Sequence, residues 1–196
     1  IVMENKPGAN SLLGAESVAR SQPDGYTFLS VLAAHAVNVT LYAGRLSFDP
    51  ARQLTPVSLV GTTPLILTVN NEFPAKDAKA LIGYAKANPD KVSYGSSGVG
   101  AAAHLTSEYL KLEAGIQMVH VPYKGTAPAL QDLIGGNIQV LVDTPLSMLP
   151  HVRAGKIRAL GVFSSKRLAG APEVPTLAEA GGPAMDASTW VMFLAP

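Results

Sequence analysis

The sequence contains no cysteine, no long apolar run and little charge of either sign. Without cysteine, a disulfide scaffold, a thiol nucleophile and a cysteine-ligated metal are excluded. The apolar runs, such as residues 64–69 and 190–194, have the length of strands, whereas a membrane-spanning helix needs about 18 residues. Charged residues make up 15% of the chain and the formal net charge is +1. This balance argues against a nucleic-acid-binding protein, because such proteins usually present a basic face.

The 196 residues are 47% hydrophobic and include 18 glycines and 15 prolines. This hydrophobic fraction excludes a disordered chain, and the length allows one domain or two small ones. The chain opens at Ile1 inside a strand-like run and stops at Pro196, directly after the apolar run 190–194. We therefore expect the sequence to be a piece of a longer protein.

Strand-like and helix-like segments alternate along the chain, which predicts an α/β fold with mostly parallel sheets. Two such series, joined near residues 64–71, predict two α/β lobes. We expect strands at 1–3, 26–32, 56–69 (two runs, broken near 61–64), 91–94, 118–121, 138–143 and 157–164. We expect helices at 11–21, 75–88, 101–114, 128–135 and 145–154, a short helix within 33–42 and a helix start at 175–180.

Three loops in the second half follow predicted strands, and ligands of open parallel sheets bind beyond the carboxyl ends of the strands. Loop 94–100 is rich in glycine and serine and precedes a helix, so its N–H groups and hydroxyls are suited to an anion. The second loop places Gly125 and Thr126 before a helix, with Lys124 beside them. The third places Asp143 at the end of an apolar strand.

Each loop also has a purely structural interpretation. Loop 94–100 lacks the lysine of a P-loop and the complete spacing of a dinucleotide-binding motif, so a tight turn with a helix cap fits it equally well. A loop lysine such as Lys124 is typically solvated, and an acid placed like Asp143 is typical of a helix N-cap.

In the first half, Ala33, Ala34 and His35 follow a predicted strand. The small side chains of the two alanines would let the backbone approach a ligand closely. His35 could donate a hydrogen bond to a carboxylate, and a packed or solvated histidine is the alternative.

Catalytic signatures are weak. The four histidines show no metal-ligand spacing, and residues 95–98 do not form the Gly-x-Ser-x-Gly elbow of a serine hydrolase. A Ser/His hydrolase would have to combine Ser96 or Ser97 with His104, which lies in the next predicted helix without a supporting acid of known geometry. His104 could equally be buried, donate to the loop, or pair with Glu108 one helical turn later. We assign no catalytic residue, no cofactor and no metal ligand.

Long motifs in a fixed order run through nearly the whole chain. They stand at residues 4–9, 23–27, 91–100 with His104, Leu105 and Glu108, 121–125, 128–129, 132–136, 154–162, 174–181 and 190–196. On these motifs the chain resembles the periplasmic solute-binding receptors of tripartite tricarboxylate transporters, often called Bug or TctC-type proteins.

The resemblance implies a two-lobed type II periplasmic-binding-protein architecture. Such a receptor captures a small carboxylate (a di- or tricarboxylate or an acidic amino acid) in a cleft between its lobes and presents it to the membrane components of the transporter. The resemblance also implies a periplasmic location, and binding through backbone amides, hydroxyls and waters without catalysis. The ligand-binding residues that it implies are Ala33, Ala34, His35, Ser96, Ser97, Gly98, Gly100, Gly125, Thr126, Ala127 and Asp143.

Compared with the family pattern, the first lobe lacks its opening strand. We expect a partial first lobe at residues 1–69, a second lobe at 70–188 and a return crossover to the first lobe at 189–196. An incomplete lobe would leave strand edges uncovered, which predicts a dimer or a strand-swapped form. Two other functions stay open: an α/β-hydrolase-like enzyme that uses the Ser96/Ser97 loop, and a truncated remnant that binds no ligand.

Overall fold

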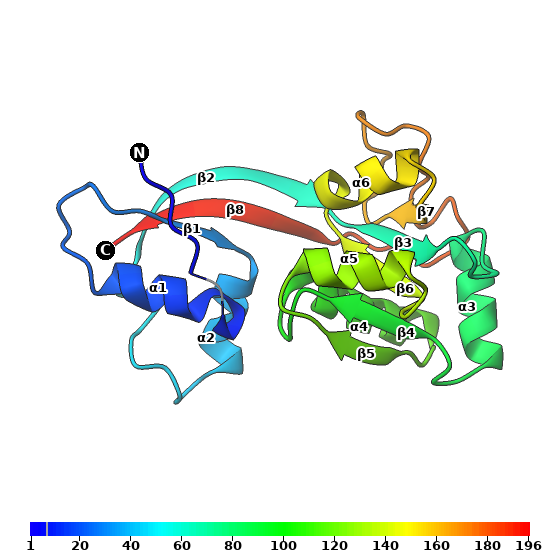
Figure 1. Cartoon of the computed structure of the whole chain (residues 1–196), viewed down its shortest axis with the longest axis horizontal. Coiled ribbons are helices and arrows are strands. Elements are labelled where there is room, and N and C mark those ends of the chain that lie inside the picture. Colours follow the sequence, from blue (N-terminus) through cyan, green and yellow to red (C-terminus); the bar gives the residue numbers. More distant parts are fainter. Residues whose placement is uncertain (7) are drawn as a thin grey trace. The chain divides into compact units, whose positions relative to one another are not determined.

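The computed structural model describes residues 1–6 and 8–196, so Pro7, in the first family motif, lies outside the described residues. The chain divides into two compact units (Figure 1). Unit 1 comprises Ile1–Thr62 and Thr189–Pro196, and unit 2 comprises Thr63–Ser188. Among the helices of the described chain, none combines the length and the apolar character that a membrane crossing requires.

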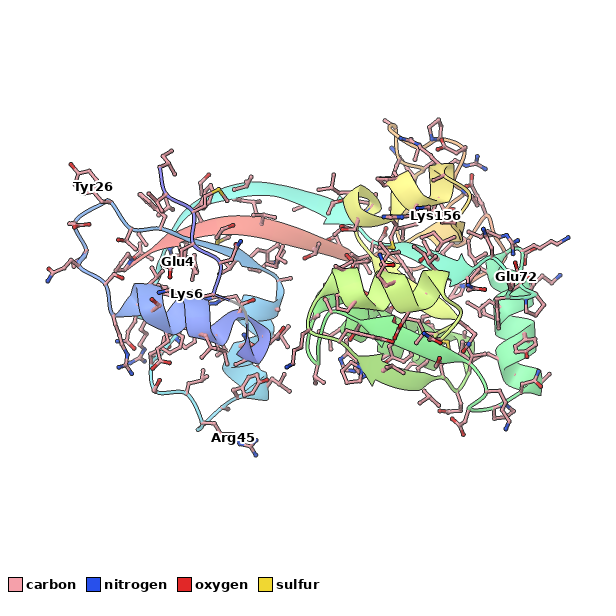
Figure 2. All side chains as sticks on the ribbon, in the orientation of Figure 1. Glu4, Lys6, Tyr26, Arg45, Glu72 and Lys156 are labelled. Carbon is pink, nitrogen blue, oxygen red and sulfur yellow. The ribbon has the colours of Figure 1, made fainter. Side chains whose placement is uncertain are left out.

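Unit 1 is built around a three-stranded sheet. Its elements are η1 (Ala9–Ser11), α1 (Leu12–Ala19), β1 (Leu29–Leu32), α2 (Ala34–Leu41), β2 (Thr55–Pro64) and β8 (Ser188–Ala195). The strand order is β1-β8-β2, and β1 runs antiparallel to β8 with Leu29 opposite Leu194. Lys6, labelled in Figure 2, donates to the hydroxyl of Ser17 in α1 at 2.7 Å. A small core holds the unit together: Leu12, Ala15, Val31, Phe48, Leu54 and Leu194.

Unit 2 contains a five-stranded mixed sheet with the order β5-β4-β6-β3-β7. Its elements are β3 (Ile66–Asn70), α3 (Ala78–Ala87), β4 (Ser93–Ser96), α4 (Ala102–Ala114), β5 (Val119–Pro122), α5 (Thr126–Ile134), β6 (Val140–Asp143), α6 (Pro145–Arg153) and β7 (Ile157–Val162). β4 runs parallel to β5 and β6, whereas β3 runs antiparallel to β6 and β7.

Helices cover both faces of this sheet, because its central strands are apolar on both sides. All five residues of β3 are buried. On one face Leu67 of β3 shares a core with Leu81 of α3 and Leu110 of α4. On the other face Ile66 shares a core with Leu133 of α5 and with α6. Unit 2 is therefore a three-layer α/β structure, as the alternation of strands and helices predicts.

Local signals fix the ends of several elements of unit 2. The Asp77 carboxylate accepts the N–H of Ala80 at 2.7 Å and caps the start of α3. Gly115, with φ of 60°, ends α4. Gly95 in β4 leaves room for Ile138, because an added Cβ would lie 2.5 Å from Cδ1 of that side chain and would force it to shift.

The structure corrects four details of the expected fold. In unit 1, β1 pairs antiparallel with β8 instead of parallel, and in unit 2 one strand, β3, runs against the other four, so that sheet is mixed. Residues 1–3 form no strand with any described residue, and they are largely exposed. The break predicted at 61–64 falls at Leu65. Residues 175–180 form turns rather than a helix, because the segment bonds to β7: the N–H of Leu177 donates to the carbonyl of Val162 at 2.9 Å.

Candidate ligand-binding site

Three helices begin at the same edge of the unit 2 sheet. β4, β5 and β6 are mutually parallel, so their carboxyl ends meet at one edge, and they are followed by α4, α5 and α6. In the described chain, no side chain caps the N-terminus of any of these three helices. The N–H groups of a first helical turn have no acceptor within their own helix and carry partial positive charge. This edge therefore presents backbone donors that suit an anion.

Glycines shape the loops that precede α4 and α5. Gly98, Gly100 and Gly125 have φ angles of 140°, 83° and 116°, values that residues with a Cβ rarely adopt. An added Cβ at Gly125 would meet no heavy atom within 4 Å. The backbone conformation, rather than a lack of space, therefore requires glycine at this position.

Thr126 and Asp143 connect the second loop to the third. The Thr126 hydroxyl donates to Oδ2 of Asp143 at 2.7 Å, and the N–H of Thr144 donates to Oδ1 at 2.7 Å. Burial raises the pKa of the Asp143 carboxyl, although both hydrogen bonds favour its charged form. The two loops are thus held together by a buried acid whose two oxygens both accept hydrogen bonds.

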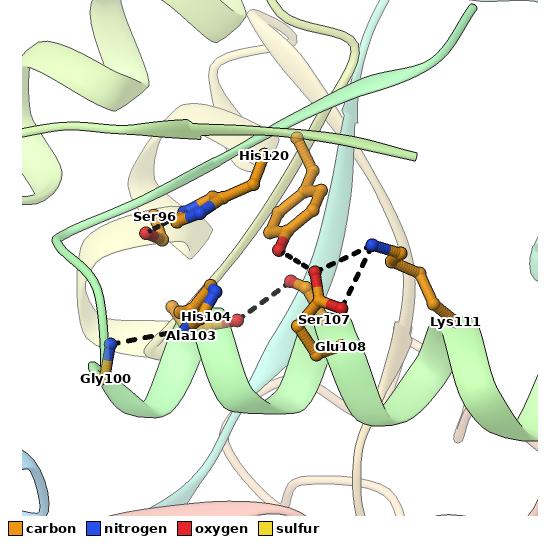
Figure 3. Close-up of polar contacts among 9 residues, drawn as sticks. Ser96, Gly100, Ala103, His104, Ser107, Glu108, Lys111 and His120 are labelled. Atoms are coloured by element: carbon orange, nitrogen blue, oxygen red, sulfur yellow. Dashed lines mark hydrogen bonds and ion pairs between the residues drawn. The ribbon is translucent and has the colours of Figure 1, made fainter. Parts of the chain in front are cut away.

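A polar network lies behind loop 96–100, between the sheet and α4 (Figure 3). Ser96, the last residue of β4, is fully buried. Its hydroxyl oxygen lies 2.7 Å from Nε2 of His120 in β5 and 3.2 Å from the carbonyl oxygen of Gly98. At the other end of the loop, the N–H of Gly100 donates to Nδ1 of His104 in α4 at 3.2 Å. Both ends of the loop are therefore bonded to a histidine.

The two histidines stack on each other, with 4.2 Å between ring centroids, and His120 also stacks on Tyr94 at 4.8 Å. The Tyr94 hydroxyl donates to Glu108, which accepts from Lys111 at 2.8 and 3.0 Å. Burial lowers the pKa of both histidines, that of His120 to about 4, and Lys111 lowers both further while Glu108 acts in the opposite direction. Both imidazoles are therefore neutral at pH 7.

In unit 1, His35 lies in the first turn of α2, after Ala33 and Ala34, and is 8% exposed. Within residues 1–6 and 8–196, its Nδ1 is the one buried side-chain nitrogen or oxygen without a hydrogen-bond partner. Burial lowers the pKa of the His35 imidazole, although a hydrogen bond with the backbone of Pro50 raises it. His35 is thus a buried neutral ring with an unused polar atom.

Two surface hollows of unit 2 lie away from the three loops. One is lined by Lys76, Asp77, Lys79, Ala159, Leu160, Pro175, Glu179, Ala180 and Gly181. The other is lined by Asn70, Glu72, Phe73, Pro74, Tyr84, Lys91, Ile134, Gly135, Gly136 and Gln139. The described residues also contain no group of three or more histidine and acidic side chains that could hold a metal ion.

The sequence profile of one protein family matches residues 1–196, and that family is described as "Tripartite tricarboxylate transporter family receptor". The chain belongs to this receptor family. Its fold is therefore that of a periplasmic solute-binding protein, as the motifs indicate.

Named proteins and solved structures similar to this chain include the following three. BugT of Bordetella pertussis strain Tohama I is 37% identical over 198 residues, which cover 100% of this chain and 60% of BugT. The R. palustris protein Rpa4515, solved with adipate, matches with a TM-score of 0.95 and 36% identity over 100% of this chain and 66% of that one. The periplasmic binding protein BugD matches with a TM-score of 0.89 and 35% identity over 98% of this chain and 64% of that one. The chain thus spans about 60% of the length of BugT.

The structure brings most of the ligand residues predicted for this receptor to one edge of unit 2. These are Ser96, Ser97, Gly98, Gly100, Gly125, Thr126, Ala127 and Asp143. Ala33, Ala34 and His35 lie in unit 1. Ser96 differs from the rest of the set, because its buried hydroxyl is already bonded inside the protein. Ligand contact at all of these positions stays a prediction.

The Ser/His pair of the hydrolase alternative is not formed. Neither serine at 96–97 is hydrogen-bonded to His104 in the part of the chain that the structure describes, and Ser96 bonds to His120 instead. Glu108, expected as a possible partner of His104, bonds to the Tyr94 hydroxyl and to a lysine of its own helix. The network behind the loop therefore supports the loop and does not form the predicted pairing of Ser96 or Ser97 with His104.

Proposed function

We propose that this chain is the ligand-binding part of a periplasmic receptor that captures a small carboxylate and delivers it to the membrane components of a tripartite transporter. One observation carries the proposal: α4, α5 and α6 begin at one sheet edge without side-chain caps among the described residues. A carboxylate offers only hydrogen-bond acceptors, so it complements an edge of N–H donors with partial positive charge. The structure of the similar protein Rpa4515 with adipate supports this class of ligand.

In this proposal, the N–H groups of Ser97, Val99 and residues 125–127 bind one carboxylate group. The N–H groups of Gly98 and Gly100 hold the loop instead, because they donate to Oγ of Ser96 at 3.3 Å and to Nδ1 of His104 at 3.2 Å. Asp143 is an acid beside them, so it favours a hydroxyl or ammonium group of the ligand over a second carboxylate at that point. Ala33, Ala34 and His35 of unit 1 are proposed as further contacts on the family resemblance. Binding occurs without turnover, because the receptor family serves transport.

A thermal-shift panel tests the proposal. The chain is heated with succinate, adipate, malate, citrate, glutamate and aspartate, and with adipamide as an uncharged control. A ligand at 100 times its Kd stabilises the folded state by about 2.7 kcal/mol, which is several degrees for a domain of this size. We expect a selective shift with at least one carboxylate and none with adipamide. Equal shifts with all compounds, or none with any, would contradict the proposal.

Replacing the acid at the site changes carboxylate affinity in a defined direction. Asp143→Asn is expected to strengthen adipate binding about fivefold at pH 7.5, because it removes a negative charge beside an anion, an effect of ~1 kcal/mol. Isothermal titration calorimetry measures the change. Asp132→Asn is the matched control, since the Asp132 carboxylate bonds instead to Tyr123 (2.6 Å) and Asn137 (3.0 Å). Weaker binding by Asp143→Asn would show that the acid contacts the ligand favourably.

A further inference from the structure

Loop 96–100 is attached at both ends to one stacked pair of histidines. Ser96 is bonded to Nε2 of His120 at 2.7 Å, and Gly100 to Nδ1 of His104 at 3.2 Å, while the two rings lie 4.2 Å apart (Figure 3). Between these two attachments stand Ser97 and Gly98, both predicted ligand contacts. The arrangement of the loop therefore depends on the state of two rings that do not themselves belong to the predicted contact set.

The Gly100 attachment depends on protonation of His104. A backbone N–H only donates, so Nδ1 of His104 must carry a lone pair to accept from it. Protonation converts both ring nitrogens into donors, which removes the acceptor and places N–H against N–H. The loop end at Gly100 then loses its partner.

The groups that face the histidine pair disfavour protonation of either ring while the hydrogen bonds of the network are formed. From α4, Lys111 adds a positive charge and Glu108 a negative one, but Glu108 is already bonded to Lys111 and to Tyr94 of β4. The stacked rings also oppose each other's charge, so one proton discourages a second. Because Glu108 already accepts hydrogen bonds from Tyr94 and Lys111, it stabilises a protonated histidine only weakly.

We propose that His104 and His120 are positioning residues of the ligand loop and make carboxylate binding sensitive to acid. This inference rests on the proposed function of the loop as a carboxylate site. With both rings neutral, Ser96 and Gly100 are held and the loop amides are ordered for the ligand. A proton on His104 releases the loop at Gly100, and the ligand is bound less tightly.

The sign of the pH dependence follows from the direction of the shifts. The ordered loop holds the histidine pKa values below their ordinary value of 6.5, to about 4 for His120, so the ordered form binds fewer protons than the released form. Affinity is therefore full above pH 6.5 and falls as the pH decreases toward 4. For one histidine with a pKa of about 4 in the ligand-free, ordered loop, affinity falls about twofold between pH 7.5 and pH 4 and about tenfold by pH 3.

Two substitutions of His104 separate positioning from simple packing. His104→Asn keeps an acceptor near the Nδ1 position without a titratable ring, so it should retain adipate affinity at pH 7.5 and lose the His104-linked fall in acid. His104→Leu leaves the N–H of Gly100 without an acceptor and should weaken adipate binding at every pH. His151→Asn, in α6 and outside the network, should keep the wild-type profile. Comparison among variants cancels the titration of adipate itself and of Asp143.

The experiment combines calorimetry with adipate and a pH titration of backbone amides by NMR in the ligand-free chain. We expect the Gly100 amide resonance to titrate in the wild type and to stay constant in His104→Asn, while adipate affinity falls in acid only where the histidine is present. His120→Gln provides a second variant if His104→Asn fails to fold. The inference would be overturned if His104→Asn and His120→Gln showed the same dependence of adipate affinity on pH as the wild type. A Gly100 amide that does not titrate in the wild type would also overturn it. Titration of Gly100 without binding of any carboxylate would instead overturn the proposed function and leave the histidine coupling supported.

Discussion

Replacing Gly125 by valine is expected to weaken adipate binding about 100-fold while the chain stays folded. Gly125 is the N-cap of α5 and has a φ of 116°, which costs a β-branched residue several kcal/mol unless the backbone moves. No atom lies within 4 Å of an added Cβ, so the new side chain does not disturb the core. The strain is relieved by a change in the backbone angles at residue 125. The N–H groups of Thr126 and Ala127 then leave their positions, and the proposed carboxylate contacts are lost.

Isothermal titration calorimetry with adipate and the thermal midpoint together test this prediction. Gly170→Val is the matched control, because Gly170 also has free space around its Cα but no positive φ. The control should bind as the wild type does. Unchanged affinity in Gly125→Val, with a folded protein, would remove the α5 N-terminus from the site.

Leu141→Ala is expected to destabilise unit 2 by about 2–5 kcal/mol, the cost of removing a fully buried leucine and leaving a cavity. Leu141 lies in β6 at the centre of the sheet, is 0% exposed and belongs to the core that α5 and α6 cover. Urea unfolding followed by circular dichroism measures the loss. Leu112→Ala in α4, where the side chain is 79% exposed, should change the free energy of unfolding by less than about 0.5 kcal/mol. Similar effects for the two variants would contradict the described core.

The sequence predicts the helices of unit 2 well, because their periodicity and their end signals agree. The helix expected at 101–114 is found as Ala102–Ala114, which ends at the left-handed Gly115. Strand direction is not encoded in the same way. β3 is buried on both faces and reads like any strand of a parallel sheet, so nothing local distinguishes its antiparallel pairing with β6.

In the candidate site, too, some features could be predicted from the sequence and others could not. The loops at Gly98 and Gly125 are predictable, because glycine before a helix and after a strand indicates a tight backbone path. The attachment of Ser96 to His120 is not, because it depends on the register between β4 and β5, in which Tyr94 lies opposite His120. Alternation places Tyr94 and Ser96 on one face of their strand, but only the register brings the imidazole to that face.

The central claim is that the loops preceding α4 and α5 bind a carboxylate, and amide chemical-shift mapping by NMR tests it most directly. Adipate is titrated into the 15N-labelled chain at pH 7.5, with adipamide as the control. We expect saturable shifts centred on the amides of residues 97–100 and 125–127 with adipate and none with adipamide. Shifts confined to other residues, such as those around Lys76 and Lys79, or equal shifts with both compounds, would contradict the account.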